Sequence, residues 1–134
     1  MMDEPITLSR TVALRTAVVS KLGEVMPQGS KIYYQQAQND HPKIYAVFTL
    51  NMVSLIDGRY TYELEINVMD YGEDTSAIEN LADSIQAVFN KLVIINDYIG
   101  VYFYAEMRNS VEEEDRNALR RRLTFSTYLY ERNE

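Results

Sequence analysis

A single histidine and several closely spaced carboxylates are the residues of this sequence whose types could support chemistry. His41 lies next to Pro42 in a polar stretch, and the sequence marks no serine and aspartate partners for it. No serine lies in a G-x-S-x-G elbow, and the five glycines form no phosphate-binding loop. We therefore interpret His41 as a loop residue and expect neither nucleophilic catalysis nor a nucleotide site.

The carboxylates are the remaining candidates for acid–base catalysis or metal binding. Glu63 and Glu65 share the polar face of an alternating strand pattern, which explains them without a catalytic role. The run from Glu112 to Asp115 lacks the alternating ligand spacing and central glycine of a calcium loop. We expect no catalytic residues, no metal site and no cofactor, and hence no enzyme.

Composition and charge narrow the function classes further. The chain has 134 residues, of which 46% are hydrophobic and 25% charged, which predicts one globular domain spanning residues 1–134. A net charge of −7 disfavours general binding to nucleic acids. Cysteine is absent, and the acidic N-terminus lacks the basic and apolar regions of a signal peptide. No apolar run is long enough to cross a membrane, so we expect a soluble protein made in the cytosol.

Two segments have apolar residues at helical spacing. The helices that they predict belong to the scaffold that would position any functional residues. The segment Thr7–Val25 begins with Thr7 as its candidate N-cap. The segment Thr75–Leu92 has a clearer apolar stripe, and Ser76 with Glu79 is a candidate capping box. We predict two amphipathic helices.

Runs of alternating, β-branched and aromatic residues predict strands at Lys31–Gln35, Ile44–Leu55, Arg59–Met69, Tyr98–Met107 and Ala118–Glu131. Polar stretches predict connections at Ala37–Pro42, Asp70–Asp74 and Asn109–Arg116. The predicted fold class is α+β, with a mainly antiparallel β-sheet of four to five strands and two amphipathic helices packed on one face.

Asp57-Gly58 predicts a β-hairpin whose register the residue pattern can decide. A two-residue loop would pair Leu50 with Glu65 and so mix apolar and charged side chains on one face. A three-residue loop over 56–58 pairs Phe48 with Ile66, Leu50 with Leu64 and Met52 with Tyr62. We predict the three-residue loop, with Gly58 in a left-handed conformation.

Near the C-terminus, an acidic patch is followed directly by a basic patch of arginines, and the last strand also carries tyrosines. These patches could pair within their own hairpin, where each ion pair contributes little. Alternatively, the acidic patch of one subunit meets the basic patch of the next, a head-to-tail contact that builds rings. The arginines could also touch DNA, although their acidic neighbours argue against this. The candidate subunit-interface residues are Glu112, Glu113, Glu114, Asp115, Arg116, Arg120, Arg122, Tyr128 and Tyr130.

The layout as a whole consists of an N-terminal helix followed by Lys43–Phe48, Arg59–Val68 with an acidic turn, Ile78–Ile85 and Arg121–Tyr128. In order, length and pattern, it resembles the tail-terminator or tail-completion proteins of long-tailed bacteriophages. The resemblance implies a virion protein that caps the tail tube and forms the tail side of the head-to-tail joint. It implies a hexameric ring of identical subunits, partnered by the tail tube protein and by head-closure or connector proteins. DNA would pass through the lumen without specific binding.

Two other hypotheses remain open from the sequence. One is a different joining part of the virion, such as a head-closure or other head–tail connector protein. The other is an enzyme or small-molecule binder with a pocket under the helices, which would need converging polar groups that the sequence does not show.

Overall fold

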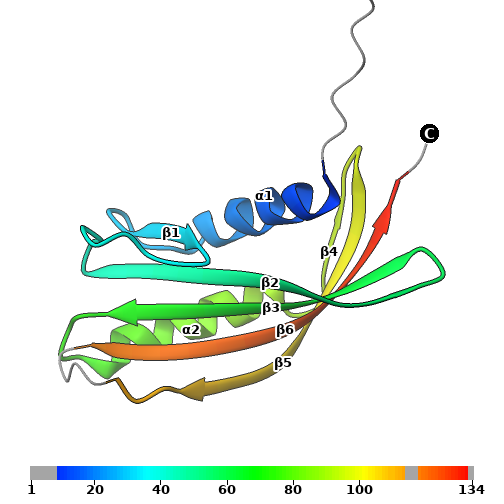
Figure 1. Cartoon of the computed structure of the whole chain (residues 1–134). Coiled ribbons are helices and arrows are strands. Elements are labelled where there is room, and N and C mark those ends of the chain that lie inside the picture. The colour runs from blue at the N-terminus through cyan, green and yellow to red at the C-terminus, as the bar shows by residue number, and fades with distance from the viewer. Residues whose placement is uncertain (1–8, 114–117, 133–134) are drawn as a thin grey trace, which may run out of the picture.

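A six-stranded mixed β-sheet with two helices makes up the described part of the chain. The computed structural model describes residues 9–113 and 118–132 (Figure 1). The sheet has the strand order β1-β2-β3-β6-β5-β4, in which β1 runs parallel to β2 and all other neighbours are antiparallel. The elements in chain order are α1 (Arg10–Gly23), β1 (Lys31–Tyr34), β2 (Ile44–Ile56), β3 (Arg59–Asp70), α2 (Thr75–Phe89), β4 (Leu92–Ile95), β5 (Ile99–Ser110) and β6 (Leu119–Glu131).

The α+β class is confirmed, but the prediction of four to five antiparallel strands is corrected to six strands in a mixed sheet. The strand that the sequence does not predict is β4. Its first residue, Leu92, falls within the helix predicted over Thr75–Leu92. Leu92 continues the apolar stripe of α2, but the chain leaves the helix at Asn90, and Lys91 takes a φ of 62°. The β-branched run that follows then pairs with β5.

One face of the sheet is buried, and both helices contribute to the core that covers it. Alternate residues of the four long strands turn toward this core, as the predicted alternation of β3 requires. From α2, the ring of Phe89 packs 5.3 Å from that of Phe103 and 5.5 Å from that of Phe125, between ring centroids. From α1, the core receives Leu14, Val18 and Leu22, all fully buried. The two helices and the central strands therefore share one hydrophobic core.

The helices begin at other residues than the sequence predicted. Ser9 caps α1, its hydroxyl accepting a hydrogen bond from the backbone N–H of Val12, whereas Thr7 lies outside the described residues. Asp74 caps α2 through a 2.8 Å hydrogen bond from the N–H of Ser76, so the predicted Ser76–Glu79 capping box is wrong. Asp74 lies two residues before Ser76 and takes the N-cap position, so the side chain of Glu79 is available for other contacts.

The predicted hairpin register is confirmed in the body of β2 and β3, but the loop is shorter than predicted. Phe48 pairs with Ile66, Leu50 with Leu64 and Met52 with Tyr62. Beyond them a β-bulge at Val53 absorbs one residue, and Ile56 pairs with Arg59 across a two-residue turn. Asp57 and Gly58 have φ angles of 52° and 77°, the combination that a tight hairpin turn needs. A bulge and a longer loop shift the register equally, so the residue pattern alone cannot distinguish them.

The connection predicted at Asn109–Arg116 begins later than expected. Strand β5 continues to Ser110, which pairs with Arg121 of β6. A second β-bulge between Ala105 and Met107 lets the longer strand stay in register. Residues 114–117 lie outside the described part of the chain.

Candidate assembly surfaces

The charged residues predicted as subunit contacts are partly paired within their own chain. Glu113 accepts a hydrogen bond from Arg120 at 3.1 Å, and Arg120 also reaches Asn67 on the neighbouring strand. Arg122 bonds to the amide oxygen of Asn109 at 3.4 Å. Glu112 is exposed, while Glu114, Asp115 and Arg116 lie outside the described residues. The Glu113–Arg120 pair has the geometry of the within-hairpin interpretation, and a contact between subunits stays a prediction.

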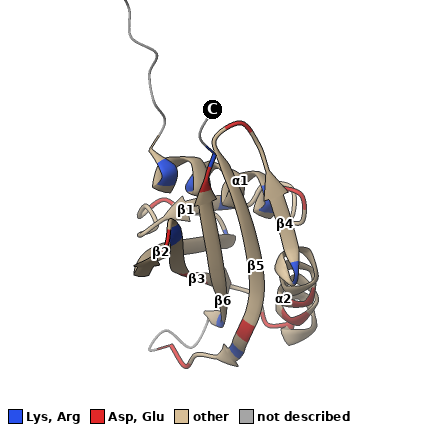
Figure 2. Ribbon diagram, turned by 90° about the vertical axis from the view of Figure 1, so that its right-hand side faces the viewer, with Lys and Arg blue, Asp and Glu red and all other residues tan. Residues whose placement is uncertain are grey.

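The predicted tyrosines join an aromatic ladder on the outer face of the sheet. Tyr128 packs edge-on against Tyr104, with ring centroids 5.9 Å apart, and Tyr130 packs against Tyr102 at 6.3 Å. Figure 2 shows the charged residues of β5 and β6 near the strand ends, so the middle of both strands is uncharged. Tyr102, Tyr104 and Tyr130 are between 41% and 45% exposed, so the outer face offers tyrosine rings, a composition typical of protein contacts.

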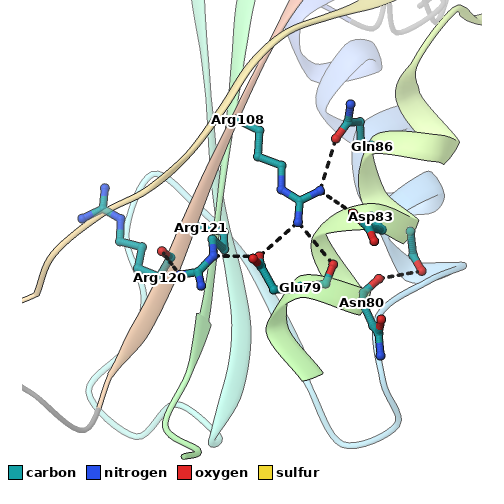
Figure 3. A network of polar contacts seen from close by, with 8 residues as sticks. Glu79, Asn80, Asp83, Gln86, Arg108, Arg120 and Arg121 are labelled. Carbon is teal, nitrogen blue, oxygen red and sulfur yellow. Dashed lines mark hydrogen bonds and ion pairs between the residues drawn. The ribbon is translucent and has the colours of Figure 1, made fainter. Parts of the chain in front are cut away.

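An ion-pair network that the sequence does not predict connects α2 to the end of the sheet. Arg108 of β5 donates to Glu79 at 3.0 Å and to Asp83 at 2.5 Å, and Arg121 of β6 donates to Glu79 at 2.8 Å (Figure 3). Both guanidinium groups are mostly buried under α2. Strand alternation could have indicated the position of Arg121. Arg121 lies two residues before the buried Leu123 and so points to the same, buried face, whereas Arg120 and Arg122 point to the opposite face.

Glu79 is the central acceptor of this network. The hydrogen bond from Arg121, followed by that from Arg108, lowers the pKa of its carboxyl below the usual value. A lowered pKa in the folded state means that folding favours the ionised form. This contribution to stability is present above the unfolded-state pKa, about 4.3, and is lost as pH falls through the lower folded-state pKa.

Replacing Glu79 by glutamine is expected to lower the free energy of unfolding by about 1 kcal/mol at pH 7, because an exposed carboxylate is screened by solvent. The side chain of Glu79 is 47% exposed. The difference between variant and wild type should shrink below about pH 4, measured by urea denaturation at several pH values. The matched control is Glu73→Gln, an exposed residue of the preceding turn for which the described structure shows no ion pair. An E79Q loss that does not change with pH would contradict the ionic role.

The single histidine, His41, lies in a cluster of aromatic rings. Its ring is tilted by 36° relative to that of Tyr45, with centroids 4.2 Å apart, and it stacks on the ring of Tyr71 at a centroid distance of 5.4 Å. Burial, reinforced by Tyr71, raises the pKa of Tyr45 to about 12, so its phenol stays protonated at neutral pH. Within residues 9–113 and 118–132, no three metal-ligating side chains gather into a site. These contacts are those of a packed loop.

Large apolar side chains are exposed at the turn between β2 and β3. We call Met52, Val53, Leu55 and Ile56 the hairpin tip; they are between 54% and 66% exposed. Met52 belongs to the inward-facing set of β2, but the hairpin extends past both helices at this end (Figure 1). Large apolar side chains exposed together at one end of a protein are typical of a protein contact site.

A cleft lies between α1 and the turn that joins β4 to β5. We call it the α1–β4 cleft; its volume is about 360 Å³. Apolar walls come from Ala13, Ala17, Ile94 and Tyr98, and its polar lining residues are Thr16, Ser20, Lys21, Asn96 and Asp97. Its lining combines these four apolar walls with five polar residues, two of which, Lys21 and Asp97, carry opposite charges.

Comparison with known proteins shows the fold but no family. No protein-family model and no curated protein matches this chain. The fold is similar to that of a solved chain from the "virion of native gene transfer agent (GTA) particle", with a TM-score of 0.71 and 14% identity, over 92% of this chain and 100% of that chain.

A second solved chain, of a protein without a descriptive name, has a TM-score of 0.69 and 14% identity, over 90% of this chain and 96% of that chain. At such identities the likeness establishes a shared fold.

Among the described residues, no helix combines the length and apolar character that a membrane span requires.

Proposed function

We propose that this protein is a structural component of a virion, one that caps the tail tube and forms the tail side of the head-to-tail joint. The observation that carries the proposal is the shared fold with a chain of a gene transfer agent virion, which spans that chain completely. The pattern resemblance to tail-completion proteins supports the same class of function and adds the place in the tail.

The surface of the molecule supports an assembly role. The hairpin tip, the tyrosine ladder and the α1–β4 cleft place apolar and aromatic groups where a neighbouring subunit can reach them. A cap at the end of a tube repeats the same contact around an axis, which requires two different patches on each subunit. The net charge of −7 is compatible with a channel that lets DNA pass without holding it.

Purified protein mixed with tail tubes that lack their cap is expected to form rings on one end of each tube, visible by negative-stain electron microscopy. Tubes alone serve as the control. The proposed ring is hexameric, and image averages of capped ends would give its symmetry. Binding to portal or connector rings instead of tubes would identify a head-closure protein, and the absence of binding to either would overturn the virion role.

A further inference from the structure

The strand β4 has one edge without a partner strand in the part of the chain that the structure describes. It pairs with β5 on one side and lies last in the strand order of the sheet (Figure 2). The backbone N–H of Asn96 donates to the carbonyl oxygen of Ile99 across the β4–β5 turn. Hydrogen-bonded and non-hydrogen-bonded pairs alternate in an antiparallel ladder, so Ile94 points its N–H and C=O toward β5. The backbone groups of Val93 and Ile95 therefore point to the open edge.

This edge lacks two features by which proteins keep other chains off their edge strands. None of the four residues Leu92–Ile95 is charged, and none is proline. Val93 and Ile95 are 51% and 67% exposed. The edge is therefore accessible to another β-strand, although β4 is short and such a contact forms few hydrogen bonds.

The charged residues that flank β4 are opposite in sign. Lys91 directly precedes the strand, and Asp97 follows it after one residue. Both are exposed, and neither has an ion-pair partner among the described residues. A second β4 strand in antiparallel orientation brings the Lys91 end of each copy beside the Asp97 end of the other, which is favourable. A parallel strand would place like charges side by side.

The net charge of −7 on each copy does not prevent this approach. Charges farther apart than about 8 Å are largely screened at physiological ionic strength, so the charges nearest the edge decide. Beside Lys91 and Asp97, these include Arg132, whose guanidinium group donates to the backbone carbonyl of Asn96 at 2.9 Å. The surroundings of β4 are therefore not acidic, unlike the chain as a whole.

We infer that two copies of this protein pair along β4 in antiparallel orientation, about a two-fold axis that passes through Ile94. Such an axis stands perpendicular to the sheet, and side chains of like faces meet only if a residue lies on it. With Ile94 on the axis, Val93 lies opposite Ile95 of the second copy, and the two exchange backbone hydrogen bonds in both directions. The same register places Lys91 opposite Asp97.

This contact goes beyond the proposed function, because it is isologous and closes at two copies. It joins two six-stranded sheets into one and leaves the hairpin tip and the tyrosine ladder free for other partners. The second copy is the occupant that the charges favour, since a strand with a cation at one end and an anion at the other is complementary to itself.

Reversing one charge at a time tests the contact in the free protein. Sedimentation equilibrium of the purified chain is expected to show a monomer–dimer equilibrium. Lys91→Glu and Asp97→Lys should each raise the dissociation constant of the dimer by about tenfold, because two attractive contacts become repulsive in a symmetric dimer. An equimolar mixture of the two variants should dimerise like the wild type, since each supplies the charges that the other needs. The matched control is Lys31→Glu, the same change at an exposed residue of β1, the opposite edge of the sheet.

A cysteine on the axis tests the register, and the natural sequence contains no other cysteine. Ile94→Cys places two thiols opposite each other with Cα atoms about 4.5 Å apart, within the range for a disulfide. Mild oxidation should give a covalent dimer on a non-reducing gel. Ile95→Cys is the control: it is more exposed, but its two copies would lie more than about 7 Å apart and should link far less.

The outcomes of these experiments are independent of the tail tube. A chain that stays monomeric at all concentrations would overturn the pairing, and so would a dimer that neither charge reversal weakens. Recovery in the mixture together with the Ile94→Cys cross-link would establish both partner and register. A failure to cap tail tubes would count against the proposed function alone, because the dimer is measured without them.

Discussion

Replacing Phe89 by alanine is expected to lower the free energy of unfolding by about 3–5 kcal/mol. Phe89 is fully buried and lies within 5.5 Å of the rings of Phe103 and Phe125, centroid to centroid. It joins α2 to two strands, so its loss leaves a cavity that neither the helix nor the sheet can close alone. Urea denaturation followed by circular dichroism measures the change.

Two further variants test whether the loss of stability comes from the missing volume of the Phe89 side chain. Phe89→Leu keeps most of the volume and is expected to cost about 1 kcal/mol. Val88→Ala removes a half-buried side chain beside it on α2 and should cost less than Phe89→Ala. An equally small loss for alanine and leucine at position 89 would show that the aromatic cluster does not anchor α2.

Replacing Val18 by aspartate is expected to destabilise the fold by about 4 kcal/mol or more, because it places an unpaired carboxylate in the core. Val18 is fully buried at the centre of the contact between α1 and the sheet, while its neighbour Val19 is 42% exposed. Such a loss is a large fraction of the stability of a typical domain, about 5–15 kcal/mol.

The control for Val18→Asp is Val19→Asp, which makes the same chemical change one residue later on the same helix. We expect a change within about 0.5 kcal/mol for the exposed position. Thermal denaturation of the two variants should therefore give widely separated midpoints. Similar midpoints would mean that α1 does not dock as described.

Some features of the candidate surfaces follow from the local sequence pattern, and others depend on the tertiary structure. The exposed side chains of β6 could be predicted, because strand alternation assigns Tyr128 and Tyr130 to one face. The exposure of the hairpin tip could not be predicted from the sequence. By alternation, Met52 points to the buried face, and it is exposed only because the hairpin extends beyond both helices. The role of Glu79 depended on Asp74 taking the N-cap, a local competition that spacing does not decide.

By itself the sequence determined the α+β class, the buried face of β3, the inner register of the hairpin and the apolar stripe of α2. These features follow from local periodicity, since a residue's face depends on its place in a repeat of 2 or 3.6. Only the tertiary structure decided that β1 pairs parallel with β2, that Leu92 starts a strand, and that Arg108 and Arg121 meet at Glu79. Each of these depends on which distant segments become neighbours, and therefore on free energy gained only when the whole sheet and both helices are assembled.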